Sequence, residues 1–224
     1  DRLLALDARR LESEGQLDEA LERYLAMMRM ARHVANRGTY IPWLIGSAIE
    51  SVVCERMPLW AAHADQTPER IRKVIGDLEI IAKDFPPVSD AVKAEYIMLR
   101  QSLESDPADF AAASGSVDGA AALVLWGRLM PWELTRARRL HNDITAWDLA
   151  TVEGVERELA AGHWEFLTKE PFYSGGVSSQ FAGYGPQVAT TPFIRLLAPA
   201  TPSIIQAPVR RETQLRALRI ILAL

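Results

Sequence analysis

Residues 15–31 read GQLDEALERYLAMMRMA, and this stretch decides the fold class. Its apolar side chains recur at spacings of three and four residues, which places them on one stripe of a helix with 3.6 residues per turn. The stripe consists of Leu17, Leu21, Tyr24, Met28 and Ala31. Gly15 lies where the chain must turn, because glycine readily adopts the positive φ that follows a helix. Asp18 and Glu19 bring negative charge to the first turn, where the helix dipole favours it.

Helical patterns extend in both directions from this stretch. A first helix is predicted over 2–13 and a second over 18–36, so that the two form a hairpin about Gly15. Further helices are predicted over 41–64, from Pro68 to the residue before Pro86, over 89–103, in a short segment from Asp106, from 120 to about 147 with an interruption near Pro131, over 152–167, and from Arg210 onward. We therefore predict an all-α fold, an irregular right-handed helical array or bundle of seven to nine helices.

Local signals refine these predictions. Thr67 followed by Pro68 is expected to start a helix, because threonine caps helix N-termini and proline suits the first helical position. Ser89 is expected to cap the next helix. Pro58 is expected to kink the helix over 41–64 or to separate its last turn, since proline lacks the N–H donor and crowds the preceding turn. The core candidates in that helix are Ile45, Ile49, Val52, Val53 and Leu59.

The composition changes after residue 170. Between Pro171 and Pro208 the only charged residue is Arg195, and the segment contains six prolines and four glycines. It is too apolar for a free linker, and long irregular segments in compact domains are usually functional loops or wrapping arms. The predicted parts are a helical domain over 1–170, an extended apolar arm over 171–208 that lies over the helices, and the start of a C-terminal helix over 209–224.

The two ends of the sequence lack the signals that usually bound a protein. Asp1 stands where an initiating methionine is expected, and a helical pattern begins at once. The last residues form an apolar run up to Leu224, without the Gly or Pro that commonly follows a helix. We expect the chain to be a segment of a longer protein whose last helix continues.

Charge and composition favour some classes of function over others. A formal net charge of −4 argues against nucleic-acid binding, because phosphate contacts need a surplus of Lys and Arg. Cys54 is the only cysteine, so an internal disulfide is excluded, and its place in a predicted helix favours a small buried side chain. The histidines are scattered without the spacing of a zinc site; they are His33, His63, His141 and His163. We expect neither a metal nor a cofactor.

No catalytic motif stands out. The glycines at 175, 176, 183 and 185 are not followed by a Lys-Ser/Thr pair, and no strand precedes them, so they do not predict a phosphate-binding loop. A G-x-S-x-G nucleophile motif is absent from the sequence. The basic segment 128–141, with Trp126 and Trp132, suits either an anionic surface or an amphipathic helix with a solvated basic face, and we favour the helix.

The stretch 8–31 resembles a tetratricopeptide-like hairpin. Gly15 at the turn, Asp18-Glu19-Ala20 at the start of the second helix, and Tyr24 four residues after the small Ala20 all match that pattern. The resemblance covers about one repeat, and no second copy follows at the expected period of about 34 residues. It implies a helical hairpin that stacks on its neighbour.

The whole chain is also similar to uncharacterised helical proteins of planctomycete-type bacteria. The similarity rests on residues 15–21, on Met130-Pro131-Trp132-Glu133 with the basic run 136–141, and on the Leu-Arg-Ala-Leu-Arg core of 210–224. It implies a final helix that continues and a membrane-anchoring segment in the full-length protein. It implies no activity, and it leaves open whether the chain is cytoplasmic or extracytoplasmic.

Two functional hypotheses follow. The first is a protein-interaction or scaffolding module that binds a protein or peptide, because stacked helical hairpins form grooves. The candidate groove residues are Tyr24, Trp43, Trp60 and Tyr96. Taken singly, each is better explained as a core residue, since large aromatic side chains dominate cores. The alternative is an enzyme or ligand-binding domain with a pocket closed by the arm over 171–208; the candidate pocket residues are Glu133, His141, Asp143 and Glu165. Neither a membrane span nor a nucleic-acid partner is predicted for this segment.

Overall fold

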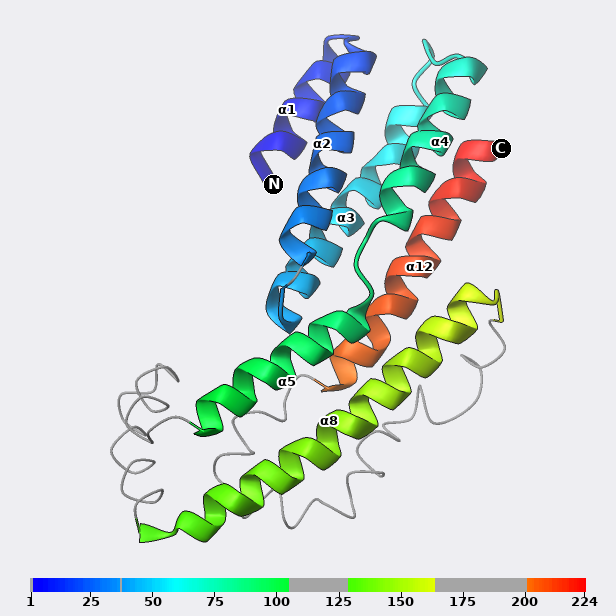
Figure 1. Ribbon diagram of the computed structural model, residues 1–224. Coiled ribbons are helices and arrows are strands. Elements are labelled where there is room, and N and C mark those ends of the chain that lie inside the picture. The colour runs from blue at the N-terminus through cyan, green and yellow to red at the C-terminus, as the bar shows by residue number, and fades with distance from the viewer. Residues whose placement is uncertain (1, 37, 105–128, 164–200) are drawn as a thin grey trace. The chain divides into compact units, whose positions relative to one another are not determined.

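The computed structural model describes residues 2–36, 38–104, 129–163 and 201–224, with side chains undescribed at 103, 131 and 201–205 within these ranges. The described residues form α-helices without any strand, which confirms the predicted all-α class (Figure 1). The helices are α1 (Arg2–Ser13), α2 (Leu17–Ala35), α3 (Tyr40–Ala61), α4 (Pro68–Lys83), α5 (Val88–Glu104), α8 (Pro131–Ala160) and α12 (Thr201–Ala223).

The chain divides into two compact units. Unit 1 consists of Asp1–Ala91 and Ala207–Leu224, and unit 2 consists of Val92–Gln206. The C-terminal helix α12 therefore contributes most of its length to the same unit as the N-terminal helices. The predicted division at 170/171 lies outside the described residues and stays a prediction.

The hairpin of α1 and α2 follows from its turn and its apolar stripe. Gly15 has a φ of 75°, and Gln16 donates its N–H to the Leu11 carbonyl at 2.9 Å, which closes the end of α1. Every residue of the predicted stripe on α2 is buried. Arg23 donates to Asp7 at 2.9 Å and so joins the two helices at their surface.

The backbones of α2 and α3 approach closely at Gly46. A Cβ added to Gly46 would lie 2.5 Å from the carbonyl oxygen of Ala31 and 2.8 Å from the Cβ of Ala35. Both alanines are buried in α2. The absence of a side chain at position 46, together with two small residues opposite, sets the distance between the two helices.

Gly46→Ala is therefore expected to lower the free energy of unfolding by about 1–3 kcal/mol, because the added methyl group overpacks a rigid contact with backbone. Gly76→Ala is the matched control: Gly76 also lies inside a helix, α4, but a Cβ there meets no atom within 4 Å. The control is expected to gain about 0.4–1 kcal/mol from helix propensity alone. Urea unfolding followed by circular dichroism measures both changes, and shifts of the same sign would contradict the close approach.

The core-facing side of α3 differs from the one predicted. Ile49 and Val53 are buried as expected, but Ile45 and Leu59 are exposed and Val52 is half-buried. The buried side of α3 instead carries Trp43, Gly46, Glu50, Cys54, Met57 and Trp60. The prediction failed because α3 is apolar around almost its whole circumference, so the spacing of apolar residues does not reveal the inner side.

The proline and cap signals predicted some helix boundaries and not others. The Thr67 hydroxyl accepts the Arg70 N–H at 3.3 Å and Pro68 is the first residue of α4, as predicted. However, α3 continues through Pro58 to Ala61, so no last turn is split off. Ser89 is not a cap, since α5 already begins at Val88.

The later helices also differ from the prediction. A single helix, α8, spans Pro131–Ala160, where separate stretches ending near 147 and starting at 152 were expected. It ends before Gly162, whose φ is 74°. Helix α12 begins at Thr201, so the last eight residues of the predicted extended arm are helical, with Pro202 in the first turn, where proline is tolerated. The remainder of the arm, 171–200, lies outside the described residues.

Candidate interaction surface

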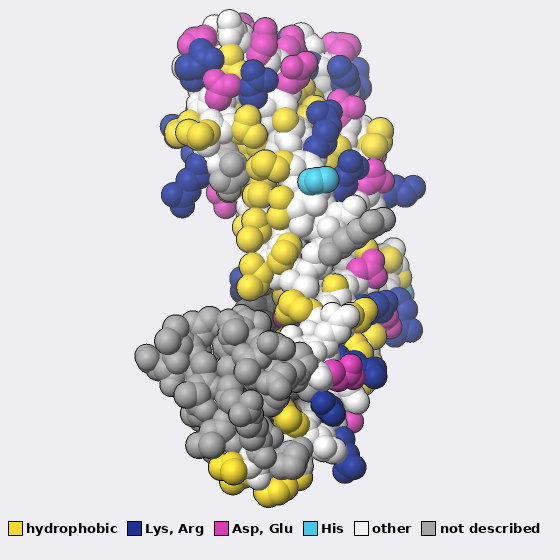
Figure 2. Space-filling model, turned by 60° about the vertical axis from the view of Figure 1, so that its left-hand side comes forward, with side chains coloured by type: hydrophobic (Ala, Val, Ile, Leu, Met, Phe, Trp, Pro, Cys, Tyr) yellow, Lys and Arg dark blue, Asp and Glu magenta, His cyan; other side chains and the backbone are white. Residues whose placement is uncertain are grey.

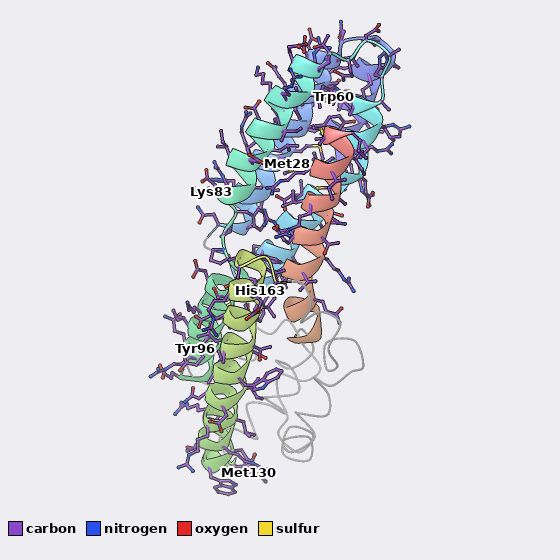
Figure 3. The ribbon with its side chains drawn as sticks, turned by 90° about the vertical axis from the view of Figure 1, so that its right-hand side faces the viewer. Met28, Trp60, Lys83, Tyr96, Met130 and His163 are labelled. Atoms are coloured by element: carbon purple, nitrogen blue, oxygen red, sulfur yellow. The ribbon has the colours of Figure 1, made fainter. Side chains whose placement is uncertain are left out.

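Three of the aromatic residues predicted to line a groove belong to the core of unit 1. Tyr24, Trp43 and Trp60 are each at most 2% exposed, and Figure 3 shows Trp60 between the helices of this unit. Their buried positions place them in the core rather than along a groove.

Each of these rings also makes a hydrogen bond through its polar tip. The Trp43 Nε1–H donates to the Pro86 carbonyl and the Trp60 Nε1–H donates to the Leu17 carbonyl, both at 2.9 Å. The Tyr24 hydroxyl donates to Glu12 at 2.7 Å. A buried aromatic with a satisfied polar group stabilises the fold and is not available to a partner.

The fourth predicted groove residue, Tyr96, lies in unit 2 and faces α8 (Figure 3). Its ring stacks on the His141 imidazole, with centroids 5.2 Å apart and an interplanar angle of 22°. Its hydroxyl donates to Asn142 at 3.0 Å and accepts from Arg100 at 3.4 Å. Tyr96 therefore joins α5 to α8 within unit 2.

Three of the four predicted pocket residues lie on α8 and differ in exposure. His141 is buried on α8, whereas Asp143, two residues and about 200° further around the helix, is exposed. Glu133 lies two turns before His141, roughly 12 Å along the helix axis. Glu165 lies outside the described residues. Most of the arm that was expected to close this pocket also lies outside the described residues, so the pocket stays a prediction.

His141 nevertheless has an unusual environment. Burial lowers the pKa of His141 below its ordinary value, and the Tyr96 backbone, which favours the charged ring, offsets only part of this cost. Nδ1 lies 3.4 Å from the Thr145 hydroxyl, and the buried Nε2 makes no hydrogen bond within the described part of the chain. Protonation would therefore place a charge and an additional N–H donor in the contact between α5 and α8.

The pH dependence of α8 follows from this shift. Because the folded pKa lies below the unfolded one, the unfolded chain binds more protons, and stability falls as pH drops from about 6.5 toward the folded value. Hydrogen exchange in α8, corrected for intrinsic rates, is expected to lose protection between pH 7.5 and pH 5.5. His141→Gln is expected to reduce that loss. An equal loss in the variant and the wild type would assign the effect to other groups.

The strongest surface feature of unit 1 is a line of exposed apolar side chains on α3. Ile41, Ile45 and Leu59 are 69%, 48% and 60% exposed. Together with Ala48, Val52 and Glu55 they follow spacings of four, three, four, three and four residues, which is one stripe along the whole helix. We call these six residues the α3 stripe.

Helix α1 adds to the exposed apolar surface. Leu3 and Leu6 lie one turn apart on α1 and are also exposed. Figure 2 shows hydrophobic side chains running down one face of unit 1. Apolar side chains that gather in this way usually mark an interaction site, whereas scattered ones need no explanation. Alternating spacings of four and three residues are those of a coiled-coil seam, so the α3 stripe has the geometry to pack against another helix.

A buried ion pair lies on the opposite, inner side of α3. Glu50 is 2% exposed and accepts hydrogen bonds from both Nε and Nη2 of Arg211 on α12, the latter at 2.9 Å. Burial raises the pKa of Glu50, while Arg211 acts in the opposite direction. Sequence reasoning missed this pair, although Glu50 is the only charged residue between Tyr40 and Cys54, and that isolation was a usable signal.

Cys54 and the metal-binding residue types were the remaining candidates for chemistry. Burial and the neighbouring Glu50 raise the pKa of Cys54 to about 12, so its thiol is a poor nucleophile at neutral pH. Within the described ranges, His, Cys, Asp and Glu side chains do not cluster in threes at metal-binding distance. Among the same residues, no helix combines the length and apolar character needed to cross a membrane.

Comparison with known proteins adds no relative. No family model matches the chain, and neither the curated proteins nor the solved structures contain a significant match. By its described helices and its surface, the chain is an all-α protein with an exposed apolar stripe on α3.

Proposed function

We propose that this chain is a protein-interaction module in which the α3 stripe binds an amphipathic helix of a partner protein. The observation that carries the proposal is the exposure of Ile41, Ile45 and Leu59 at coiled-coil spacing. An apolar stripe on a partner helix would bury these side chains, each of which contributes roughly 1.5–3 kcal/mol when fully removed from water.

The tetratricopeptide-like hairpin of α1 and α2 fits the same proposal. Consecutive hairpins present alternate helices on one face and so create extended binding surfaces. In unit 1 the alternate helices are α1 and α3, and both carry exposed apolar residues. The alternative function, a pocket for catalysis or a small ligand, depends on the arm over 171–208, most of which lies outside the described residues.

Ile45→Asp is expected to weaken partner binding at least about tenfold, because complex formation would then bury a carboxylate within the contact. Ile80→Asp is the matched control, since Ile80 is an equally large exposed side chain on α4 and lies outside the stripe. Proteins retained from an extract of the source cells by wild type and by each variant are compared by quantitative mass spectrometry. Titration calorimetry then gives the affinity for the purified partner.

Circular dichroism of both variants must match the wild type, so that lost binding reports on the surface. A partner retained equally by wild type, Ile45→Asp and Ile80→Asp would place the interface elsewhere. If no protein in the extract is retained more strongly by the wild type than by Ile45→Asp, the proposal loses its basis.

A further inference from the structure

Helix α12 packs against α3 and α4 of unit 1, although it lies far from them in sequence (Figure 1). We call the surface of α3 and α4 that it covers the seat. The anchor of α12 is Arg211. Besides the two hydrogen bonds to Glu50, the Arg211 Nη2 donates to the Ala82 carbonyl at 3.3 Å. The guanidinium carbon lies 4.0 Å from the centroid of the Phe85 ring, in a cation–π contact. One side chain of α12 is thus recognised by three groups at once.

The remaining contacts follow the same helix face. Gln214 donates to the Ser51 hydroxyl at 2.8 Å, one turn beyond Arg211. Three leucines then enter the core at spacings of three and four residues; they are Leu215, Leu218 and Leu222. The seat on α3 and α4 therefore fits an amphipathic helix whose side chains follow the pattern Arg-x-x-Gln-Leu-x-x-Leu-x-x-x-Leu.

Glu50 makes this seat selective. Because its carboxylate is buried, a helix without a cation at the matching position would leave it as an unpaired charge or force it to take up a proton. Lysine is a poor substitute, since a compact ammonium cannot form the two-pronged contact with Glu50 and lie over Phe85 at the same time. Apolar surface alone does not provide such discrimination, because it accepts many amphipathic helices.

Helix α12 also enters unit 1 from a separate unit. The boundary between the units falls between Gln206 and Ala207, inside α12, and Pro208 follows at once. Proline removes one backbone hydrogen bond and weakens a helix at that point. Along the chain, the part of α12 that carries Arg211 is therefore connected to the rest of unit 1 only through unit 2. The connection passes through the point near Pro208 where the helix is weakened.

We propose that the seat on α3 and α4 is a helix-binding site whose specificity is set by Glu50, and that it binds the α12 helix of a second copy of this chain. Exchange of an identical element lets two copies form the contacts already made within one copy, so no new interface is required. The second copy is the occupant because its α12 presents the matching arginine, glutamine and leucines. The proposal concerns the inner side of α3 and does not depend on the α3 stripe.

The test uses the unmodified chain and a synthetic peptide of residues 207–224. Sedimentation velocity of the wild-type chain is expected to show a dimer that increases with protein concentration. An excess of the peptide is expected to return the dimer to monomer, because the peptide fills the seat. The peptide with Arg211→Ala is expected to be about thirtyfold or more weaker as a competitor. The peptide with Arg216→Ala is expected to compete far better than the Arg211→Ala peptide, because the ion pair of Arg216 with Glu212 lies within α12 and does not contact Glu50.

A complementation experiment distinguishes exchange from other association. The chain with Arg211→Ala keeps an intact seat, and the chain with Glu50→Ala keeps an intact helix. Each alone is expected to be monomeric, and their mixture is expected to form a one-to-one heterodimer. A wild-type chain that stays monomeric at all concentrations would overturn the proposal. A dimer that resists the peptide, or that persists in either single variant, would also overturn it.

Discussion

Arg211→Ala is expected to lower the free energy of unfolding of unit 1 by about 3–5 kcal/mol, far more than the loss of a surface charge. The reason lies in the residue left behind. Without Arg211, the buried Glu50 must remain as an uncompensated carboxylate or take up a proton. The Phe85 ring and the Ala82 carbonyl lose a partner at the same time.

Urea unfolding followed by circular dichroism gives the change in stability, and hydrogen exchange in α3 assigns it to unit 1. Arg216→Ala removes an arginine from the same helix, but its part-buried ion pair with Glu212 lies within α12, so a loss of only about 0–1 kcal/mol is expected. The double replacement Glu50→Met with Arg211→Met is expected to recover much of the loss, because apolar side chains of similar size often replace a buried pair without cost. Equal effects of Arg211→Ala and Arg216→Ala would show that Glu50 is not buried with its partner.

Trp60→Ala is expected to cost about 3–5 kcal/mol as well, for a different reason. The Trp60 ring is fully buried and its Nε1–H bonds the Leu17 carbonyl at the start of α2, so it joins the end of α3 to the first hairpin. Removal of the ring leaves a cavity that the surrounding helices cannot close. Trp60→Phe retains an aromatic ring and loses the hydrogen bond, so a smaller loss is expected.

The same urea experiment measures this series, with Trp132→Ala as the control. Trp132 is 61% exposed on α8, and its removal is expected to change stability by no more than about 0.5 kcal/mol. If Trp60→Ala were as mild as Trp132→Ala, Trp60 would not be part of the core of unit 1.

The helices with local start signals and one apolar stripe were predictable. Gly15 and the stripe from Leu17 to Ala31 predicted the first hairpin, and Thr67-Pro68 predicted the start of α4. Helix α3 was predictable as a helix, but its inner side was not, because isoleucines, valines and tryptophans surround it. Only tertiary packing, through the close approach at Gly46, determines which of them face the core.

The candidate surface was less predictable than the fold. The tryptophans and tyrosines were considered as groove residues because aromatic side chains serve both cores and interfaces, and the chain uses three of them in the core. Ile45 and Leu59 were assigned to the core because they are apolar, and they are exposed. Glu50 was detectable as a charge in an apolar stretch, but its pairing with Arg211 depends on a long-range contact that spacing cannot reveal.

Cys54 gives the chain an intrinsic reporter of its own opening. It is the only thiol in the sequence, it lies one turn after Glu50, and its burial both shields it from reagents and raises its pKa to about 12. An alkylating reagent therefore modifies it only in molecules where the inner side of α3 has become accessible. The rate of that modification follows the opening of unit 1 without any engineered label, because no other sulfhydryl contributes to the signal.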